Sequence, residues 1–303
     1  MIQLENADQA AKLAMSYMKP GMITNHVMTA AEYHADVEAG VLYAHIWPGG
    51  VLFLRGREGY QLLSYCINDL GIMPGCRLPD NVLCEIGYKP SGVAAAEGAV
   101  RFWAAVGLKM AFERVRLTRM LGQEGPPGGA GAAIVQKDRQ LVSIFGRNGY
   151  NIESVGNLTL PPPIAPIGIP LLSLADECDI DSCHRLMHEC FDVITGHIPT
   201  YRELKESVAA GCILCMKDSS GAVCGLLRCV ARVGSTEIRQ LAIREDMRGQ
   251  GLARLLLDAF IEKWGRGKCT VWVRNGYAPA LNAYRSADFV ADGWRSSVMV
   301  AAG

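Results

Sequence analysis

The spacing of apolar residues changes between positions 235 and 260, which predicts a strand, a tight turn and a helix. Residues 235–244 read as the strand. After the turn, one set of apolar residues repeats at intervals of three and four, as on the buried face of a helix. This set is Leu252, Leu255, Leu256, Ala259 and Phe260. The helix is therefore expected to begin near Gly251.

The rest of the second half divides into short strands and helices. Strands are predicted at 171–174, 212–217, 222–232 and 268–274, and helices at about 181–191, 200–210 and 279–287. Asp-Ser-Ser-Gly at 218–221 is typical of a hairpin, and Pro279 suits the first turn of a helix. Residues 289–300 complete the sheet with one or two strands. This order indicates an α/β (α+β) fold.

The first half repeats part of this order. It has three predicted strands at 41–47, 51–55 and 60–66, then a strand at 83–88, a helix at 93–103 and a strand at 107–117. Trp103 and Leu108 have the same spacing as Tyr284 and Phe289, although chance similarity between two α/β stretches is the alternative. Residues 68–79 hold two prolines and no amphipathic pattern. This copy is therefore expected to lack a helix there.

Two stretches rich in glycine and proline, at 122–131 and 160–166, separate the halves. The residues between them, at about 132–150, are a candidate bridging helix. A chain of 303 residues is long enough for two ordinary domains. We therefore predict a first domain at 1–121, a linker or bridging segment at 122–170, and a second domain at 171–303.

Composition argues against two classes of binding partner. Thirty basic residues balance thirty acidic ones, so neither nucleic acid nor an anionic membrane is an expected partner. No apolar run approaches the ~20 residues that cross a bilayer, and the N-terminus lacks the pattern of a secretion signal. Eleven scattered cysteines resemble reduced, small hydrophobic residues. A cytoplasmic location is expected.

Two residue pairs have metal-ligand spacing. Cys212 and Cys215 lie in a predicted strand, where positions three apart point to opposite faces. His184 and His188 lie four apart on a predicted helix, but no carboxylate-bearing motif accompanies them. An ordinary helix surface is the favoured interpretation, and no metal is expected.

The turn after residue 244 suits anion binding at a helix N-terminus. Its small residues leave backbone N–H groups accessible, and the helix dipole favours a phosphate there. A plain strand-to-helix connection is one alternative. A dinucleotide-binding turn would need a third glycine where Arg254 stands, and no glycine precedes Lys-Ser or Lys-Thr as in an ATPase phosphate loop.

Three segments together resemble the GCN5-related N-acetyltransferases, the GNAT superfamily. They are residues 240–243, Arg-Gly-Gln-Gly-Leu-Ala at 248–253, and residues 279–289. The resemblance covers roughly the last 130 residues, one ordinary domain. It implies two tandem GNAT-like domains, the first degenerate, each a mixed, mostly antiparallel twisted sheet flanked by helices. It also implies acetyl-CoA as cosubstrate, held by Leu241, Ala242, Ile243, Arg248, Gly249, Gln250, Gly251, Leu252, Ala253 and Asn282.

The resemblance also assigns catalytic roles. Tyr284 stands where the family has a general acid that protonates the coenzyme thiolate, with packing on the core as the alternative. Glu237 stands where some members carry the carboxylate that deprotonates the amine, with a solvated strand residue as the alternative. The family also implies that the strands after positions 243 and 268 splay apart. Tyr277 and Asp288 depart from the family, which often has Asn and Gly there.

The expected function is an N-acetyltransferase that moves an acetyl group directly from the thioester to a primary amine. One active site is expected, in the second domain. Two alternatives are a non-catalytic acyl-CoA-binding or sensing protein and an acyltransferase that uses a longer acyl-CoA. The acceptor is expected to be a small-molecule or peptide amine. Two fused copies are compatible with either a monomer or a homodimer.

Overall fold

The structure is a computed structural model that describes residues 1–17, 22–25, 30–121, 135–137, 140–142, 170–232, 234–264 and 267–301. The expected strand, turn and helix around residue 250 are present. The second half contains β10 (Leu171–Leu174), α4 (Ile180–Cys190), α5 (Tyr201–Ala209), β11 (Ile213–Lys217), β12 (Val223–Arg232), β13 (Ser235–Ile243), α6 (Leu252–Trp264), β14 (Gly267–Arg274), α7 (Ala278–Ser286) and β15 (Val290–Ala301).

The first half begins with short elements that the sequence pattern did not predict. It contains β1 (Ile2–Gln3), α1 (Ala7–Tyr17), β2 (Ile23–Thr24), α2 (Ala30–Glu38), β3 (Leu42–Trp47), β4 (Gly50–Arg57), β5 (Tyr60–Ile67), β6 (Val82–Tyr88), α3 (Val93–Ala105) and β7 (Leu108–Leu121). Residues 68–81 hold no helix, as expected from their prolines.

The segment between the halves differs from the expected bridging helix. β8 (Val135–Lys137) and β9 (Gln140–Val142) form an antiparallel pair, and β9 also contacts β10. The helix expected over 132–150 is therefore wrong for these residues. The rest of that stretch, with most of the expected linker at 122–170, lies outside the described residues.

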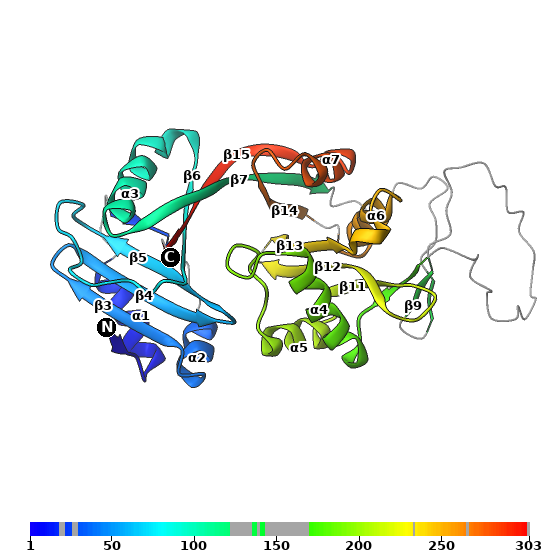
Figure 1. Ribbon diagram of the computed structural model, residues 1–303, viewed down its shortest axis with the longest axis horizontal. Coiled ribbons are helices and arrows are strands. Elements are labelled where there is room, and N and C mark those ends of the chain that lie inside the picture. Colours follow the sequence, from blue (N-terminus) through cyan, green and yellow to red (C-terminus); the bar gives the residue numbers. More distant parts are fainter. Residues whose placement is uncertain are drawn as a thin grey trace, which may run out of the picture.

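Each half contributes one long strand to the other (Figure 1). β7 leaves the first half and pairs antiparallel with β14 through residues 114–121. β15 returns from the second half and pairs antiparallel with β6 through residues 295–300, while β7 and β15 also pair with each other. Hydrogen-bonded ladders therefore join residues 1–121 to residues 171–303.

The described strands form one sheet in the order β1-β3-β4-β5-β6-β15-β7-β14-β13-β12-β11-β10-β9-β8, with β2 on β5. Its pairs are antiparallel except β5 with β6 and β13 with β14. Helices flank the sheet in both halves (Figure 1). The expected mixed, mostly antiparallel architecture is confirmed.

Helices cover both faces of the second half's sheet. Leu226 and Leu227 are neighbours on β12, so their side chains point to opposite faces. Leu227 packs in a core with Leu256 and Phe260 of α6, and Leu226 packs in a separate core with Leu186 of α4. The apolar face predicted for α6 is thus buried, which fixes the end of α6 beside β13.

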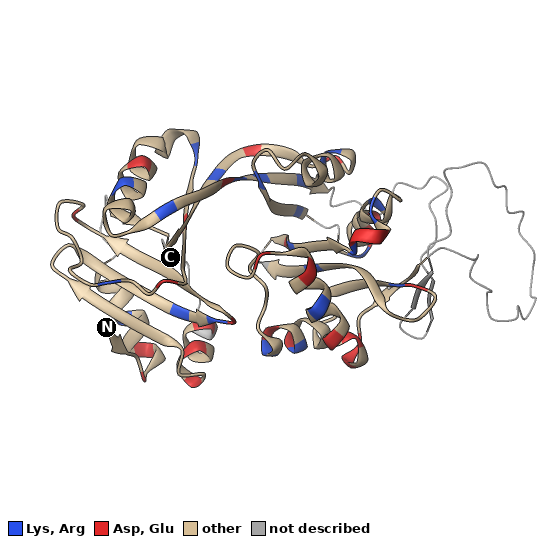
Figure 2. Cartoon of the chain, viewed as in Figure 1, with Lys and Arg blue, Asp and Glu red and all other residues tan. Residues whose placement is uncertain are grey.

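Neither charge nor hydropathy marks out one particular surface of the protein. Lys and Arg are interspersed with Asp and Glu over both halves (Figure 2). Among the described residues, no helix is long and apolar enough to cross a membrane. Anion binding must therefore arise from local geometry.

Candidate functional site

The parallel strands β13 and β14 separate part-way along their length and form a wedge. Paired positions run from Ser235 with Lys268 to Ile238 with Val271. Beyond them, β13 pairs with β12 and β14 pairs with β7. The two strands thus diverge before position 243, the position after which the family resemblance implied that they splay apart. Residues 239–243 have no strand partner on the wedge side within the described chain.

Backbone groups of β13 face this wedge. The Ile243 carbonyl accepts a hydrogen bond of 3.0 Å from Nε of Arg248, which follows β13 and lines the wedge. The N–H and C=O groups of alternate strand residues point to the same edge, so those of Leu241 face the wedge as well. An extended ligand could add there as a further strand.

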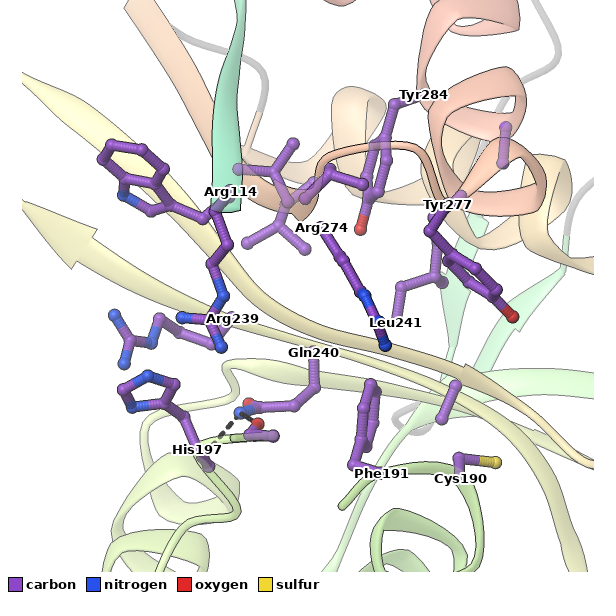
Figure 3. A pocket seen from close by; sticks show the side chains of 18 of the residues that line it. Arg114, Cys190, Phe191, His197, Arg239, Gln240, Leu241, Arg274, Tyr277 and Tyr284 are labelled. Carbon is purple, nitrogen blue, oxygen red and sulfur yellow. Dashed lines mark hydrogen bonds between the residues drawn. The ribbon is translucent and has the colours of Figure 1, made fainter. Parts of the chain in front are cut away.

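A cavity of about 470 Å³ occupies the wedge (Figure 3). Its walls come from β13, β14, α7, the loop at 190–197 and, from the first half, Glu85, Phe112 and Arg114. Seven of the expected site residues line it: Glu237, Leu241, Ala242, Ile243, Arg248, Ala253 and Tyr284. The others, Gly249, Gln250, Gly251, Leu252 and Asn282, lie outside its lining.

The loop between β13 and α6 turns on two glycines. Gly249 and Gly251 have φ values of 77° and 79°, which L side chains rarely adopt. An added Cβ at either position would meet no atom within 4 Å, so conformation rather than crowding requires glycine. Arg254 and Leu255 donate their N–H groups to the Gly251 carbonyl, which begins α6. The preceding amides of the first turn remain available for an anion.

Arg248 adds a positive charge beside these amides. Besides its bond to Ile243, its guanidinium lies 3.8 Å from the Cys190 sulfur. No carboxylate among the described residues pairs with it. The loop therefore presents both amides and an unneutralised cation.

Tyr284 packs in the core and also faces the cavity. Its ring lies edge-on to Phe289, with centroids 5.6 Å apart, and the residue is 4% exposed. Its hydroxyl points into the cavity, towards Arg274 (Figure 3). Burial raises the pKa of the Tyr284 phenol above its usual value, so the group keeps its proton at neutral pH. The two sequence interpretations, acid and core residue, are therefore compatible.

Glu237 lies on β13 at the closed end of the wedge, where it still pairs with Thr270. One carboxylate oxygen accepts a hydrogen bond of 2.8 Å from Arg239. Burial alone would lower the pKa of Arg239, but the attraction of Glu237 raises it. The negative charge of Glu237 is therefore partly balanced by the adjacent guanidinium of Arg239.

The first half supplies a charged cluster that sequence reasoning missed. Glu85 of β6 pairs with Arg114 of β7, and its Oε1 atom lies 3.0 Å from Nε2 of His197. Burial would raise the pKa of Glu85, but the contact with His197 and the charge of Arg114 hold it well below its usual range. Only tertiary contact brings these groups together, so spacing along the chain gave no signal.

His197 occupies a strained position in the loop after α4. Its φ is 51°, and the Gln240 side chain donates a hydrogen bond of 2.7 Å to its carbonyl (Figure 3). Burial lowers the pKa of the imidazole despite the nearby Glu85. The neutral ring can donate Nε2–H to that carboxylate, which holds the loop of the second half against β6.

Residues 180–289 match the model of the acetyltransferase (GNAT) family. The whole chain is similar to a tandem GNAT protein from the clavulanic acid biosynthesis pathway, at 12% identity over 99% of this chain and 97% of that one, with a TM-score of 0.54. Residues 180–289 therefore carry the sequence pattern of the GNAT family. The whole chain has the fold of a tandem GNAT protein, the arrangement expected from its sequence.

Two further solved structures share the fold of this chain. A GCN5-related N-acetyltransferase from Sphaerobacter thermophilus is 13% identical over 97% of this chain and 90% of that chain, with a TM-score of 0.52. A GNAT-family acetyltransferase from Colwellia psychrerythraea is 9% identical over 99% and 98% of the two chains, with a TM-score of 0.50. No curated protein matches the chain.

The first GNAT-like half contains a corresponding wedge that the chain itself fills. β5 and β6 run parallel only from Gln61 with Val82 to Leu63 with Cys84. β2 then pairs with the end of β5. Asn25, the next residue, donates hydrogen bonds of 2.9 Å to the carbonyls of Leu63 and Glu85. Its side-chain oxygen accepts a hydrogen bond of 2.8 Å from the Tyr65 N–H, so one side chain bridges β5 and β6.

The acid position also differs in the first half. Trp103, which matches Tyr284 in spacing, is fully buried, and its centroid lies 5.0 Å from that of Tyr65. An indole N–H is a hydrogen-bond donor without useful acidity. Among its described residues, the first half thus lacks a free edge at this wedge, a glycine loop that opens a helix, and an acid at the position that corresponds to Tyr284.

The Gly251→Val substitution should weaken acetyl-CoA binding. Valine disfavours the required positive φ and places a side chain beside the loop amides. We expect the Kd from calorimetry to rise about tenfold, which corresponds to ~1.4 kcal/mol. Gly75→Val is the matched control because Gly75 has a φ of 62°, equally open surroundings and a position between β5 and β6 in the first half. Equal effects of both substitutions would contradict a coenzyme role for the loop.

The His197→Asn substitution should flatten the dependence of stability on pH. Below about pH 6.5 an unfolded histidine gains a proton that folded His197 resists, so the wild-type free energy of unfolding should fall as pH falls. Asparagine tolerates the positive φ but does not titrate. Denaturation at pH 5.5 and 7.5 measures the slope, with exposed His34→Asn as control. An unchanged slope in His197→Asn would show that the ring titrates freely.

The Asn25→Ala substitution should lower stability by about 1–3 kcal/mol, because it leaves buried backbone groups of β5 and β6 without partners. Urea denaturation measures this change. Asn68→Ala, at an exposed asparagine, is the control. Acetyl-CoA affinity should stay at the wild-type value, since the second wedge is untouched. A stability equal to that of the control would refute the bridging role.

Proposed function

We propose that the protein is an acetyl-CoA-dependent N-acetyltransferase with one active site, in the wedge between β13 and β14. The observation that carries the proposal is that three groups meet at one cavity. They are the unpaired edge of β13, the two ends of the glycine loop at Arg248 and Ala253, and the inward-pointing hydroxyl of Tyr284. A pocket for an unrelated ligand would not need all three.

The donor is proposed to bind chiefly through backbone groups. Its diphosphate lies against the amides from Gly249 to Ala253, with Gln250 and Leu252 contributing main chain and Arg248 contributing charge. Its pantetheine arm runs along Leu241, Ala242 and Ile243 as an added strand. Asn282 is exposed on α7, so any contact with the coenzyme lies beyond the cavity.

The proposed reaction is a direct transfer. The neutral amine nitrogen attacks the thioester carbonyl carbon, and a backbone N–H in the wedge stabilises the oxyanion. The C–S bond then breaks, and the Tyr284 hydroxyl gives its proton to the departing thiolate. The ammonium proton leaves to Glu237, directly or through water. Glu237 also accepts a hydrogen bond of 2.8 Å from Arg239, which keeps this carboxylate in place on β13.

The first half is proposed to shape the acceptor site. Residues 171–303 carry the donor contacts, while Glu85, Phe112 and Arg114 come from residues 1–121 and close the opposite wall. Arg274 reaches into the cavity, with its guanidinium 4.8 Å from the centroid of the Phe112 ring. A small-molecule or peptide amine would enter between this wall and the splayed strands.

The Tyr284→Phe substitution tests the chemistry. We expect kcat to fall about 10²–10⁴-fold with an unchanged Kd for acetyl-CoA, because only proton donation is removed. Release of free thiol from acetyl-CoA with a panel of amines measures turnover. Since the pKa of Tyr284 is raised, wild-type kcat should not fall between pH 8 and 9.5 through loss of this proton. Tyr43→Phe, on β3, is the control for a lost hydroxyl.

Three outcomes would redirect the assignment. Full turnover by Tyr284→Phe would remove its role as the acid. Tight acetyl-CoA binding without thiol release for any amine would favour an acyl-CoA sensor. Faster turnover with longer acyl-CoA donors than with acetyl-CoA would indicate that the enzyme naturally transfers a longer acyl group.

A further inference from the structure

Three potential metal ligands meet on the side of α4, away from the wedge. His184 and His188 lie one turn apart, and Glu58 reaches them from the turn between β4 and β5. The Nε2 atom of His184 lies 3.2 Å from one Glu58 oxygen and 3.3 Å from Nε2 of His188. The second Glu58 oxygen lies 3.9 Å from His188 Nε2. Sequence spacing had offered only the two histidines.

A hydrogen bond within this cluster pairs only two of its three ligand groups. A neutral imidazole nitrogen either carries a proton or carries a lone pair. If His188 donates to His184, the bare nitrogen of His184 faces a carboxylate oxygen. If His184 donates to Glu58 instead, the Nε2 lone pair of His188 has no donor within the cluster. A cation placed between them would accept lone pairs from all three side chains.

The distances suit a tetrahedral metal ion. Bonds of about 2.0–2.1 Å to nitrogen and oxygen separate neighbouring ligand atoms by about 3.3–3.4 Å in tetrahedral zinc. The separations of 3.2 and 3.3 Å match this value, and the carboxylate can rotate to shorten the third. Two histidines and one carboxylate are a common zinc ligand set that leaves a position for water.

Packing fixes the position of Glu58, the third potential ligand, independently of the histidines. Gly59, next to Glu58, has a φ of 79°, and an added Cβ there would lie 2.7 Å from a methyl carbon of Val193. The Gly59 carbonyl also accepts a hydrogen bond of 3.3 Å from Asn81. The β4–β5 turn is therefore held against the loop after α4, with Glu58 directed at the histidines.

We propose that Glu58, His184 and His188 form a site for a divalent transition-metal ion of the zinc class. The ion links the first half to α4 of the second half. Because β7, β15 and the His197–Glu85 contact join the halves elsewhere, such a link adds a further fixed point and holds the cavity walls from both halves in register. The site is distinct from the proposed active site and supplies no catalytic group.

The test uses the full chain after removal of metals with a chelator and without an affinity tag. Calorimetry with Zn²⁺ should show one saturable site per chain, and Zn²⁺ should raise the Tm. Glu58→Gln, His184→Gln and His188→Gln should each raise the Kd at least about tenfold, the scale on which lost site contacts weaken metal binding. His34→Gln, an exposed histidine on α2, should leave the Kd unchanged.

Cobalt separates this site from the cysteines. Co²⁺ bound to nitrogen and oxygen ligands should show visible absorption without the near-ultraviolet band of thiolate ligation. Acetyl-CoA affinity, measured for each variant, shows that the fold is intact. Absence of saturable Zn²⁺ binding, a Kd unaffected by the three substitutions, or thiolate absorption from the bound ion would each overturn the proposal.

Discussion

Backbone hydrogen-bonding groups at a diverging pair of strands need partners, and this constraint organises both halves of the molecule. An unpaired N–H or C=O group in a buried position costs about as much as a lost hydrogen bond. In the first half, β2 and Asn25 supply the missing partners permanently. In the second half the edge of β13 faces a cavity instead. The same local geometry thus gives a filled wedge in one half and an open cavity in the other.

Strand exchange makes the two halves interdependent. β14 has β7 of the first half as its antiparallel partner, and β6 has β15 of the second half. Neither sheet is complete without the strand from the other half. The exchange also places Arg114 of β7 in the cavity wall, where it meets Glu85 and the His197 loop. The first half therefore supplies part of the cavity wall, including charged side chains, although its own wedge is filled.

Local patterns predicted the elements whose signals lie within a short stretch. The apolar repeat from Leu252 to Phe260 and the glycines before it fixed α6 and its loop, and two prolines excluded a helix at 68–79. The exchange of β7 and β15 was not predictable. The alternating pattern of a strand is the same whether the strand pairs within its own half or with a strand of the other half. Glu85 and His197 were missed for a related reason, since their contact joins residues far apart in sequence. The short β2 gave no signal because its role depends on a gap that exists only after folding.

Amide hydrogen exchange with and without acetyl-CoA tests the central claim most directly. Coenzyme bound along the open edge should protect the amides at 239–243 and 249–253, while those at 63–67, already covered by β2 and Asn25, should exchange at unchanged rates. Protection confined to the first half, or none at 239–243, would contradict the assignment of the open wedge as the coenzyme site.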